Sequence, residues 1–370
     1  MADAEQGDAQ HEQGAERLSM TGGDQLQPLG IPVSLLDVVP VTARESSADA
    51  LDRARELARL GDQLGYHRLW YAEHHSMPGI ASTAPEVLVA NAAAITRRIR
   101  VGSGGVMLPN HSPLTVAERY ATLDALHPGR IDLGVGRAPG TDRRTMLALR
   151  RGAGDDDLAE LLYELFGYLR GFPADDPLRG LLAYPRPVES PTVVVLGSSD
   201  YGARLAAALS LPYAFAHHFS ARFSTLAMRL YRDEFQPSAE LPRPHAILTV
   251  SVVCADTDEE ARRLASAWAL SFLRLRSGHP PSPFPTAEEV AAHPWTDDQR
   301  AFLDEHLAAQ AVGSPATVHA RLRTLIEETG ADELMATVPV TDAAARRRSV
   351  EMLARLAAAP TAGDAALREP

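Results

Sequence analysis

The chain has 370 residues, of which 45% are hydrophobic, enough apolar material for one large domain or two. A net charge of −12 and a pI of about 5.5 argue against a nucleic-acid partner, and no apolar run reaches the roughly 18 residues of a transmembrane helix. The single cysteine, Cys254, excludes an internal disulfide framework, and the absence of lysine excludes Schiff-base and P-loop lysine chemistry. We therefore expect a cytoplasmic protein that binds neither nucleic acid nor membrane.

The two ends of the chain differ in composition from the rest. Residues 1–30 are rich in Gln, Gly and Asp and have few apolar positions, which is the opposite of a signal peptide. We predict that they form a disordered tail, and that residues 359–370 form a flexible C-terminal tail. Residues 31–358 would then be the folded domain.

Between the tails, short apolar runs alternate with amphipathic or Ala-rich stretches. Strands are predicted at 33–38, 68–72, 99–107, 131–134, 192–196, 213–216, 247–253 and 333–337. Helices are predicted at 48–64, 85–97, 114–126, 156–170, 201–210, 221–235, 257–275, 315–329 and 342–358. Most of the strands are almost continuously apolar, which is typical of a parallel sheet that is covered on both faces.

This alternation predicts an α/β fold, a (β/α)8 TIM barrel with an insertion after the seventh strand. A doubly wound sheet is the alternative, but it needs a glycine-rich loop after its first strand, and "LLDVVPVTARESS" contains no glycine. The insertion is the Pro-rich segment 277–300, which is too long for an ordinary loop and would act as a lid over the barrel.

Several strands end in residues that carry chemistry, and in a barrel the C-terminal ends of the strands form the active site. The candidate functional residues in or after these strands are Glu73-His74-His75, Gly104-Gly105, Arg137, Ser198-Ser199 and His217-His218. Burying a carboxylate beside imidazoles costs several kcal/mol unless the groups are paired. These ends therefore either bind a ligand or satisfy one another in a structural network.

Two of these ends suggest how a ligand would bind. Gly197, Ser198 and Ser199 close a strand and open a helix, which is a favourable place for a phosphate, although a simple serine N-cap is the alternative. Arg137, with Gly136 and Ala138 beside it, has room to hold such an anion. Gly104-Gly105 inside a strand lets a flat ring approach the backbone, and a β-bulge is the equally plausible alternative.

A metal site is the less favoured interpretation of the histidines. His74 and His75 are neighbours on an extended segment and point to opposite sides, so a metal would need a third ligand. His217, His218 and Asp37 are the candidates for that ligand, in a barrel metallohydrolase. We predict no metal, with one of the two neighbouring histidines facing the pocket.

The motifs "AEHHSMPGIASTAPEVL", "GSGGVMLPNHSPL", "GRIDLGVGRAPGTD" and "LGSS" together resemble the bacterial luciferase-like flavin monooxygenases, over residues 31 to 350. The chain is most similar to the branch in which one polypeptide replaces the two luciferase subunits. The resemblance implies a TIM barrel that binds reduced FMN. It also implies that the flavin reacts with O₂ to form a C4a-peroxide, which oxygenates a small organic substrate.

The resemblance also implies roles for individual residues. Gly104 and Gly105 match a non-prolyl cis peptide against which the isoalloxazine packs. His74 matches a catalytic histidine near the flavin edge, Glu73 the carboxylate beside it, and Arg137 the arginine beside the flavin and its phosphate. These three residues are the catalytic set that the resemblance implies. The full cofactor-binding set implied is Asp37, Gly104, Gly105, Val106, Arg137, Arg150, Ser198, Ser199 and Gly202, the last three as the phosphate loop and Arg150 as an additional phosphate arginine.

One departure from the family concerns the luciferase reactive cysteine, whose position is Gly136 here. Its absence puts light emission and an aldehyde substrate in doubt. The Ala, Arg and Pro richness fits a high-GC genome, in which an aromatic polyketide and a role in antibiotic biosynthesis are reasonable expectations.

Partners follow from the same resemblance. A separate NAD(P)H:flavin reductase would supply the reduced flavin, since no nicotinamide-binding fingerprint is present, and a homodimer would form through helices near the second and third strands. The alternatives are an F420-dependent oxidoreductase that transfers hydride on the same fold, and a non-catalytic flavin-binding partner protein.

Overall fold

The structure, a computed structural model, describes residues 26–138, 141–149 and 157–357. Residues 1–25, Arg150 and the predicted tail 359–370 lie outside the described residues. The strands within the described ranges are β1 (Val33–Asp37), β2 (Arg68–Tyr71), β3 (Arg100–Met107), β4 (Ile131–Gly136), β5 (Thr192–Gly197), β6 (Tyr213–Ala216), β7 (Ala246–Cys254), β8 (Ala311–Gly313) and β9 (Glu333–Thr337).

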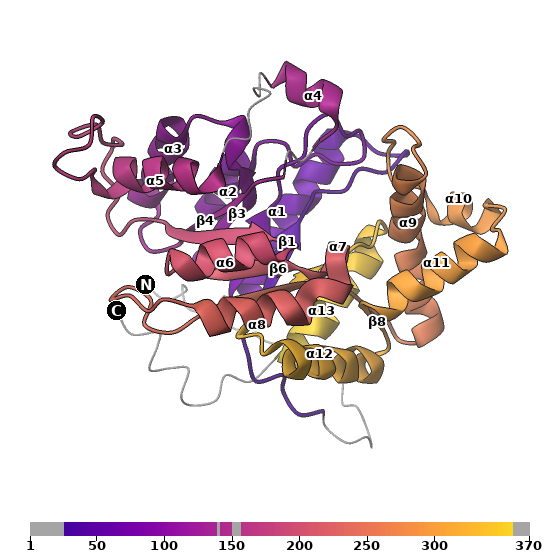
Figure 1. Cartoon of the computed structure of the whole chain (residues 1–370). Helices are drawn as coiled ribbons and strands as arrows, with labels where there is room; N and C mark the ends of the chain where they lie inside the picture. The colour runs from indigo at the N-terminus through magenta and orange to yellow at the C-terminus, as the bar shows by residue number, and fades with distance from the viewer. Residues whose placement is uncertain (1–25, 139–140, 150–156, 358–370) are drawn as a thin grey trace, which may run out of the picture.

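Helices separate the strands along the chain (Figure 1). The α-helices are α1 (Ser47–Leu64), α2 (Pro85–Ile95), α3 (Pro113–Leu126), α4 (Arg143–Ala148), α5 (Leu158–Arg170), α6 (Asp200–Ala208), α7 (His217–Ser220), α8 (Ser224–Glu234), α9 (Asp258–Arg276), α10 (Ala287–Ala292), α11 (Asp297–Ala308), α12 (Pro315–Thr329) and α13 (Ala343–Ala357). The 3₁₀ turns η1 (Leu108–Asn110) and η2 (Ala221–Phe223) precede α3 and α8. Local sequence fixes helix ends: Ser46 and Asp49 form a capping box at the start of α1, and Gly65 ends that helix with a φ of 80°.

The strands form a closed parallel barrel. Their order is β6-β5-β4-β3-β2-β1-β9-β7, and β6 also pairs with β7, which closes the ring. β8 pairs with β7 outside this ring. The predicted (β/α)8 TIM barrel with an insertion after the seventh strand is confirmed, with β9 as the eighth barrel strand.

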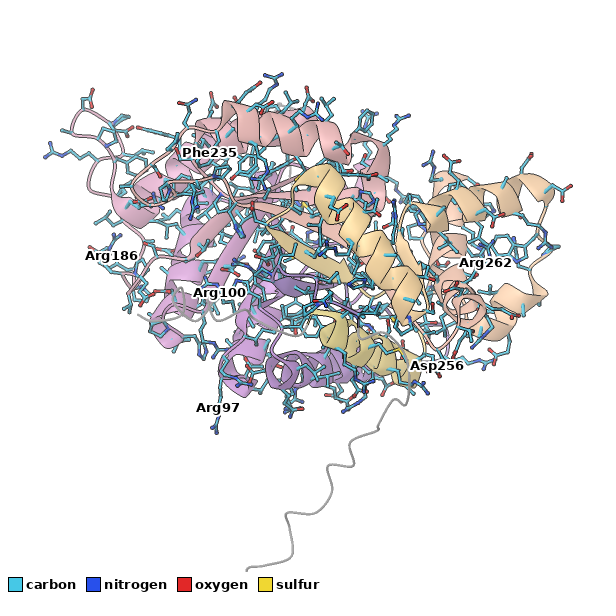
Figure 2. All side chains as sticks on the ribbon, turned by 90° about the horizontal axis from the view of Figure 1, so that it is seen from below. Arg97, Arg100, Arg186, Phe235, Asp256 and Arg262 are labelled. Carbon is cyan, nitrogen blue, oxygen red and sulfur yellow. The ribbon has the colours of Figure 1, made fainter. Side chains whose placement is uncertain are left out.

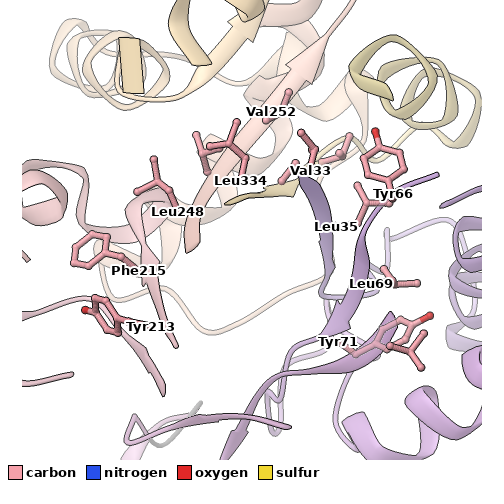
Figure 3. Packing of buried hydrophobic residues seen from close by; sticks show 14 of the residues in the cluster. Val33, Leu35, Tyr66, Leu69, Tyr71, Tyr213, Phe215, Leu248, Val252 and Leu334 are labelled. Carbon is pink, nitrogen blue, oxygen red and sulfur yellow. The ribbon is translucent and has the colours of Figure 1, made fainter. Parts of the chain in front are cut away.

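Several barrel strands present alternate side chains to two different apolar layers. Leu35, Leu69 and Tyr71 belong to the large cluster between the barrel and its helices, part of which Figure 3 shows. Leu36 and Trp70, their chain neighbours, belong to a smaller cluster that also includes residues of β5, β6, β7 and β9. Burial on both faces explains why the strands read as continuous apolar runs.

A network of buried charges connects the first residues of several strands. Arg68 donates to the carboxylate of Glu333 at 3.0 Å and to that of Asp132 at 3.0 Å, and both carboxylates are fully buried. Arg100, which is labelled in Figure 2, also donates to Asp132. Trp70 adds a hydrogen bond of 2.9 Å from its Nε1 to the same carboxylate. Because these residues are near the N-terminal ends of the strands, the network stabilises the barrel at the end opposite to the expected chemistry.

The segment after β7 has more regular structure than its Pro-rich sequence predicts. It contains α10, leads into α11 and ends with β8, and none of these three elements was predicted. The Phe284 N–H donates to the Val41 carbonyl at 2.9 Å, and the Phe284 ring stacks on Trp268 of α9 at 4.7 Å. The segment therefore lies against the loop after β1.

No helix in the described ranges is long and apolar enough to span a membrane.

Candidate active site

A cavity of about 260 Å³ opens at the C-terminal ends of the barrel strands, and we call it the main cavity because most of the barrel strands line it. Its lining comes from residues in or directly after β1 to β7 and β9, and from the helices that follow them. The lining includes Leu36, Val38, Ala72, Gly104, Gly105, Met107, Gly136, Arg137, Leu196, Ser198, Ser199, Tyr201, Gly202, Ala214, His218, Phe219, Thr249, Trp268 and Thr337. Of the residues selected from the sequence, this cavity brings together the glycine pair, Arg137 and the whole predicted phosphate loop.

The glycine pair lies in the middle of β3 and is joined by a cis peptide bond, as the family resemblance implies. A Cβ on Gly104 would stand 2.7 Å from Leu36 Cδ1, and a Cβ on Gly105 would stand 2.6 Å from the Gly134 carbonyl oxygen. Barrel packing alone therefore requires glycine at both positions. Gly136 differs, because its Cβ would meet only Met107 Sδ, at an ordinary contact distance of 3.4 Å.

Polar groups gather at one side of this cavity. Ser198 and Ser199 precede α6, their side chains are exposed, and Ser199 is the N-cap residue although its hydroxyl makes no capping hydrogen bond. The Arg137 guanidinium lies 4.4 Å from the ring centroid of Tyr201, in the first turn of α6. Free backbone N–H groups at a helix start attract an anion, and a guanidinium holds a phosphate through paired hydrogen bonds.

Glu73 connects the loop after β2 to the end of β3. Its fully buried carboxylate accepts hydrogen bonds from His75 Nε2 at 2.7 Å, His111 Nε2 at 3.0 Å and the Met107 N–H at 2.9 Å. Burial alone would raise the pKa of Glu73, but these hydrogen bonds outweigh it and hold the pKa below its ordinary value. Glu73 is therefore a structural anion that fixes the segment following Gly104-Gly105.

His74 points to a different place from His75. It lines a second cavity, of about 140 Å³, whereas His75 donates to Glu73. Burial lowers the pKa of His74 to about 4, so its imidazole is neutral at pH 7. Its Nδ1 is buried and has no hydrogen-bond partner among the described residues. This resolves which of the two histidines faces a pocket.

The two cavities are neighbours. Phe219, which follows β6, and Trp268, in α9, line both of them. His74 is therefore close to the main cavity without lining it.

His218 lines the main cavity, although the sequence analysis gave it no role in binding the cofactor. Its Nδ1 lies 3.2 Å from the Thr249 carbonyl oxygen, which can only accept, so Nδ1 carries the proton. Burial lowers the pKa of His218 to about 4. A neutral ring with a lone pair on Nε2 therefore lines the main cavity. Its neighbour His217 is satisfied by Ser224 and the Ala309 carbonyl.

Asp37 and Val106 are not among the lining residues of either cavity. The Asp37 carboxylate accepts from Arg346 at 2.7 Å and from the Val39 N–H at 2.8 Å. It thereby supports the left-handed turn at Val39, whose φ is 52°, next to the cavity residue Val38. Val106 packs in the outer apolar layer. The part of the chain that is described contains no group of three His, Cys, Asp or Glu residues able to hold a metal ion.

Comparisons with known proteins agree with this architecture. A family model described as "Luciferase-like monooxygenase" matches residues 33–333. A protein named "Luciferase-like monooxygenase" from Escherichia coli (strain K12) is 42% identical over 331 residues, which cover 87% of this chain and 96% of that protein. The crystal structure of apo-MsnO8 has 38% identity and a TM-score of 0.80, and the match covers 90% of this chain and 99% of that one.

A more distant structure shares the fold. It is the oxygenating constituent of 3,6-diketocamphane monooxygenase from Pseudomonas putida in complex with FMN, a type II Baeyer-Villiger monooxygenase. Its identity to this chain is 21% and its TM-score is 0.63, with 89% of this chain and 98% of that chain covered.

Proposed function

The chain belongs to the luciferase-like monooxygenase family and is an oxidoreductase, and from this premise we propose that it binds reduced FMN and uses O₂ to oxygenate a small organic substrate. The observation that carries the proposal is the main cavity, which brings together the glycines of β3 and β4 and the start of α6, a place suited to an anion. The FMN bound by the Pseudomonas putida relative supports this choice of cofactor.

The lining residues fit the parts of FMN. Gly104, Gly105 and Gly136 leave the backbone of β3 and β4 accessible to a flat ring system. Ser198, Ser199 and the first N–H groups of α6 would hold the phosphate, with Arg137 as its charged partner. Reduced FMN, when bound, supplies the electrons that activate O₂, and the protein positions it and excludes water.

His74 is the proposed proton carrier. It lies at the cavity next to the cofactor cavity, its Nδ1 is unsatisfied, and its low pKa keeps it neutral at pH 7. A neutral imidazole is able to accept a proton from a substrate hydroxyl or return one during oxygenation. Glu73 fixes the loop that carries His74, because it joins His75 to Met107 and His111.

For partners, we propose a separate NAD(P)H:flavin reductase and a homodimer through α2 and α3. The single cysteine, buried at Cys254, is in keeping with a reducing compartment, for which we propose the cytoplasm. As the substrate class we propose an aromatic secondary metabolite, and a role in antibiotic biosynthesis would follow from it. The aromatic side chains of Phe219 and Trp268 between the two cavities support an aromatic substrate.

The experiment is an anaerobic titration with chemically reduced FMN and, separately, with reduced F420, each then mixed with oxygen in a stopped-flow cell. We expect binding of reduced FMN and a transient flavin absorbance that free reduced FMN does not show. Binding of F420 alone, without any oxygen-dependent transient, would refute the monooxygenase and favour hydride transfer.

A further inference from the structure

The guanidinium of Arg137 lies against an aromatic ring in the lining of the main cavity. Arg137 directly follows β4 and stands between Gly136 and Ala138, which are too small to restrict its long side chain. Its Cζ lies 4.4 Å from the centroid of the Tyr201 ring, in the first turn of α6, and both residues line the cavity. A cation–π contact at this distance limits where the guanidinium can lie.

The Tyr201 ring is itself fixed at its hydroxyl end. The hydroxyl donates to Asp157 Oδ1 at 2.9 Å, and Asp157 is the N-cap residue of α5, where it also accepts from the Ala159 N–H at 3.0 Å. The hydrogen bonds from Ala159 and Tyr201 lower the pKa of this carboxylate, and the charge of Arg137 lowers it further. A chain of contacts thus runs from the start of α5 through Tyr201 to Arg137, and it connects the starts of two helices to the end of β4.

Stacking and phosphate binding use different parts of a guanidinium. An aromatic ring contacts its planar face, whereas a phosphate is bound by the N–H groups at its edge. Arg137 can therefore keep its contact with Tyr201 while it holds an anion. A side chain that is already placed loses less conformational entropy on binding, which strengthens its interaction with the ligand.

We propose that Tyr201 is a positioning residue, which holds the Arg137 guanidinium beside the start of α6 for the phosphate of the cofactor. The inference rests on the proposed function, because it takes the ligand of Arg137 to be the phosphate of reduced FMN. Tyr201 acts through Arg137 and not on the phosphate itself. Its ring therefore provides the effect, and its hydroxyl orients the ring.

The test compares reduced FMN with reduced riboflavin, which lacks the phosphate, in anaerobic titrations of the full chain. The ratio of the riboflavin dissociation constant to the FMN dissociation constant measures what the phosphate contributes. In Tyr201→Leu this ratio should fall about two- to fivefold, the range of a partly exposed cation–π contact, while the riboflavin dissociation constant stays unchanged. Tyr201→Phe keeps the ring and should restore the wild-type ratio.

Tyr163→Leu is the matched control. Tyr163 is an exposed tyrosine of α5 whose hydroxyl donates to Asp176 at 2.5 Å, but it is not among the described lining residues of the main cavity. This variant should bind both flavins like the wild type. An unchanged ratio in Tyr201→Leu, or an equal loss of affinity for riboflavin, would overturn the proposal. So would a loss in Tyr201→Phe as large as that in Tyr201→Leu, since the hydroxyl would then be the group that binds.

A second titration separates this inference from the proposed function. Inorganic phosphate is added to the flavin-free protein, and the NMR signal of the Arg137 Nε–H group, assigned with Arg137→Lys, reports its binding. We expect weaker phosphate binding in Tyr201→Leu than in the wild type and Tyr201→Phe. Such a dependence supports the positioning role even if reduced FMN does not bind. If reduced FMN binds but neither titration depends on Tyr201, the positioning role alone is refuted.

Discussion

Neighbouring histidines with opposite directions are the clearest residue-scale feature of this site. His75 donates to the buried Glu73 carboxylate, whereas His74 lines the second cavity, of about 140 Å³, and its buried Nδ1 has no partner among the described residues. The extended backbone predicts that the two rings diverge, but the sequence does not show which ring points inward. That depends on where Glu73 lies, and Glu73 is fixed by the Met107 N–H and His111, which are distant in sequence.

If His74 transfers protons, His74→Ala should lower the rate of product formation about 100-fold or more, the usual contribution of a general acid or base. Binding of reduced FMN should be nearly unchanged, because His74 does not line the cofactor cavity. Rapid-mixing kinetics with a turned-over substrate measures the first effect and anaerobic titration the second. The exposed His279→Ala is the control. Equal rates in both variants would remove His74 from the mechanism.

Arg137 is predicted to act on the phosphate and not on the ring system. In Arg137→Ala the dissociation constant for reduced FMN should rise about 10- to 100-fold, the range of a charge-assisted hydrogen bond. Reduced riboflavin, which lacks the phosphate, should bind the variant and the wild type equally. Arg204→Ala, an exposed arginine of α6 paired with Glu234, is the matched control. A similar loss for riboflavin would show that Arg137 contacts the ring instead.

At the scale of elements, the long apolar strands and long helices follow from the sequence, whereas the short elements do not. β8 has three residues and α7 has four, too few for a periodic pattern to be recognised. α10 and α11 depend on capping boxes that begin at Thr286 and Thr296, in a segment whose prolines suggest a loop. The residues at the ends of the strands, by contrast, do predict the location of the site, because the barrel topology brings these ends together.

Gly104, in the middle of β3, and Gly136, at the end of β4, allow the effects of packing and of flavin binding to be separated. Gly104→Ala should lower the free energy of unfolding by about 1–3 kcal/mol, since its Cβ would overlap Leu36 and Trp70. Gly136→Ala should leave stability nearly unchanged, because its Cβ makes only an ordinary contact with Met107, yet it should weaken binding of reduced FMN. Denaturant titration and anaerobic flavin titration measure the two effects. A Gly136→Ala variant with wild-type affinity would exclude this face of the cavity from flavin contact.

The whole molecule is held together by pairs that no local pattern reveals. Arg68 and Glu333 are separated by 265 residues and Arg346 and Asp37 by 309, yet each pair is buried and joined by a charged hydrogen bond. A sequence shows a charge at the start of a strand but not its partner on a distant strand. The predicted role of Asp37 in cofactor binding illustrates this, because the structure pairs Asp37 with Arg346 beside the cavity.

Three partly buried histidines are predicted to make the stability of the molecule sensitive to mild acid. Burial lowers the pKa of His67, His74 and His218 to about 4, against an ordinary value of 6.5. Between these values the unfolded chain takes up protons and the folded chain does not, so the free energy of unfolding should fall as the pH drops from 6.5 to 4. Denaturant titrations across this range should show the decline, with a shallower slope in His67→Gln. A free energy of unfolding that does not change between pH 6.5 and 4.5 would contradict the lowered pKa values of these histidines.

The central claim is that one cavity holds reduced FMN with its ring at Gly104-Gly105 and its phosphate at the start of α6. A crystal structure of the protein with reduced FMN, prepared anaerobically, tests this most directly. We expect the isoalloxazine against the β3 glycines and the phosphate within hydrogen-bond distance of Ser198, Ser199 and Arg137. A flavin in the second cavity, beside His74, or a phosphate away from α6, would contradict the proposed cofactor site.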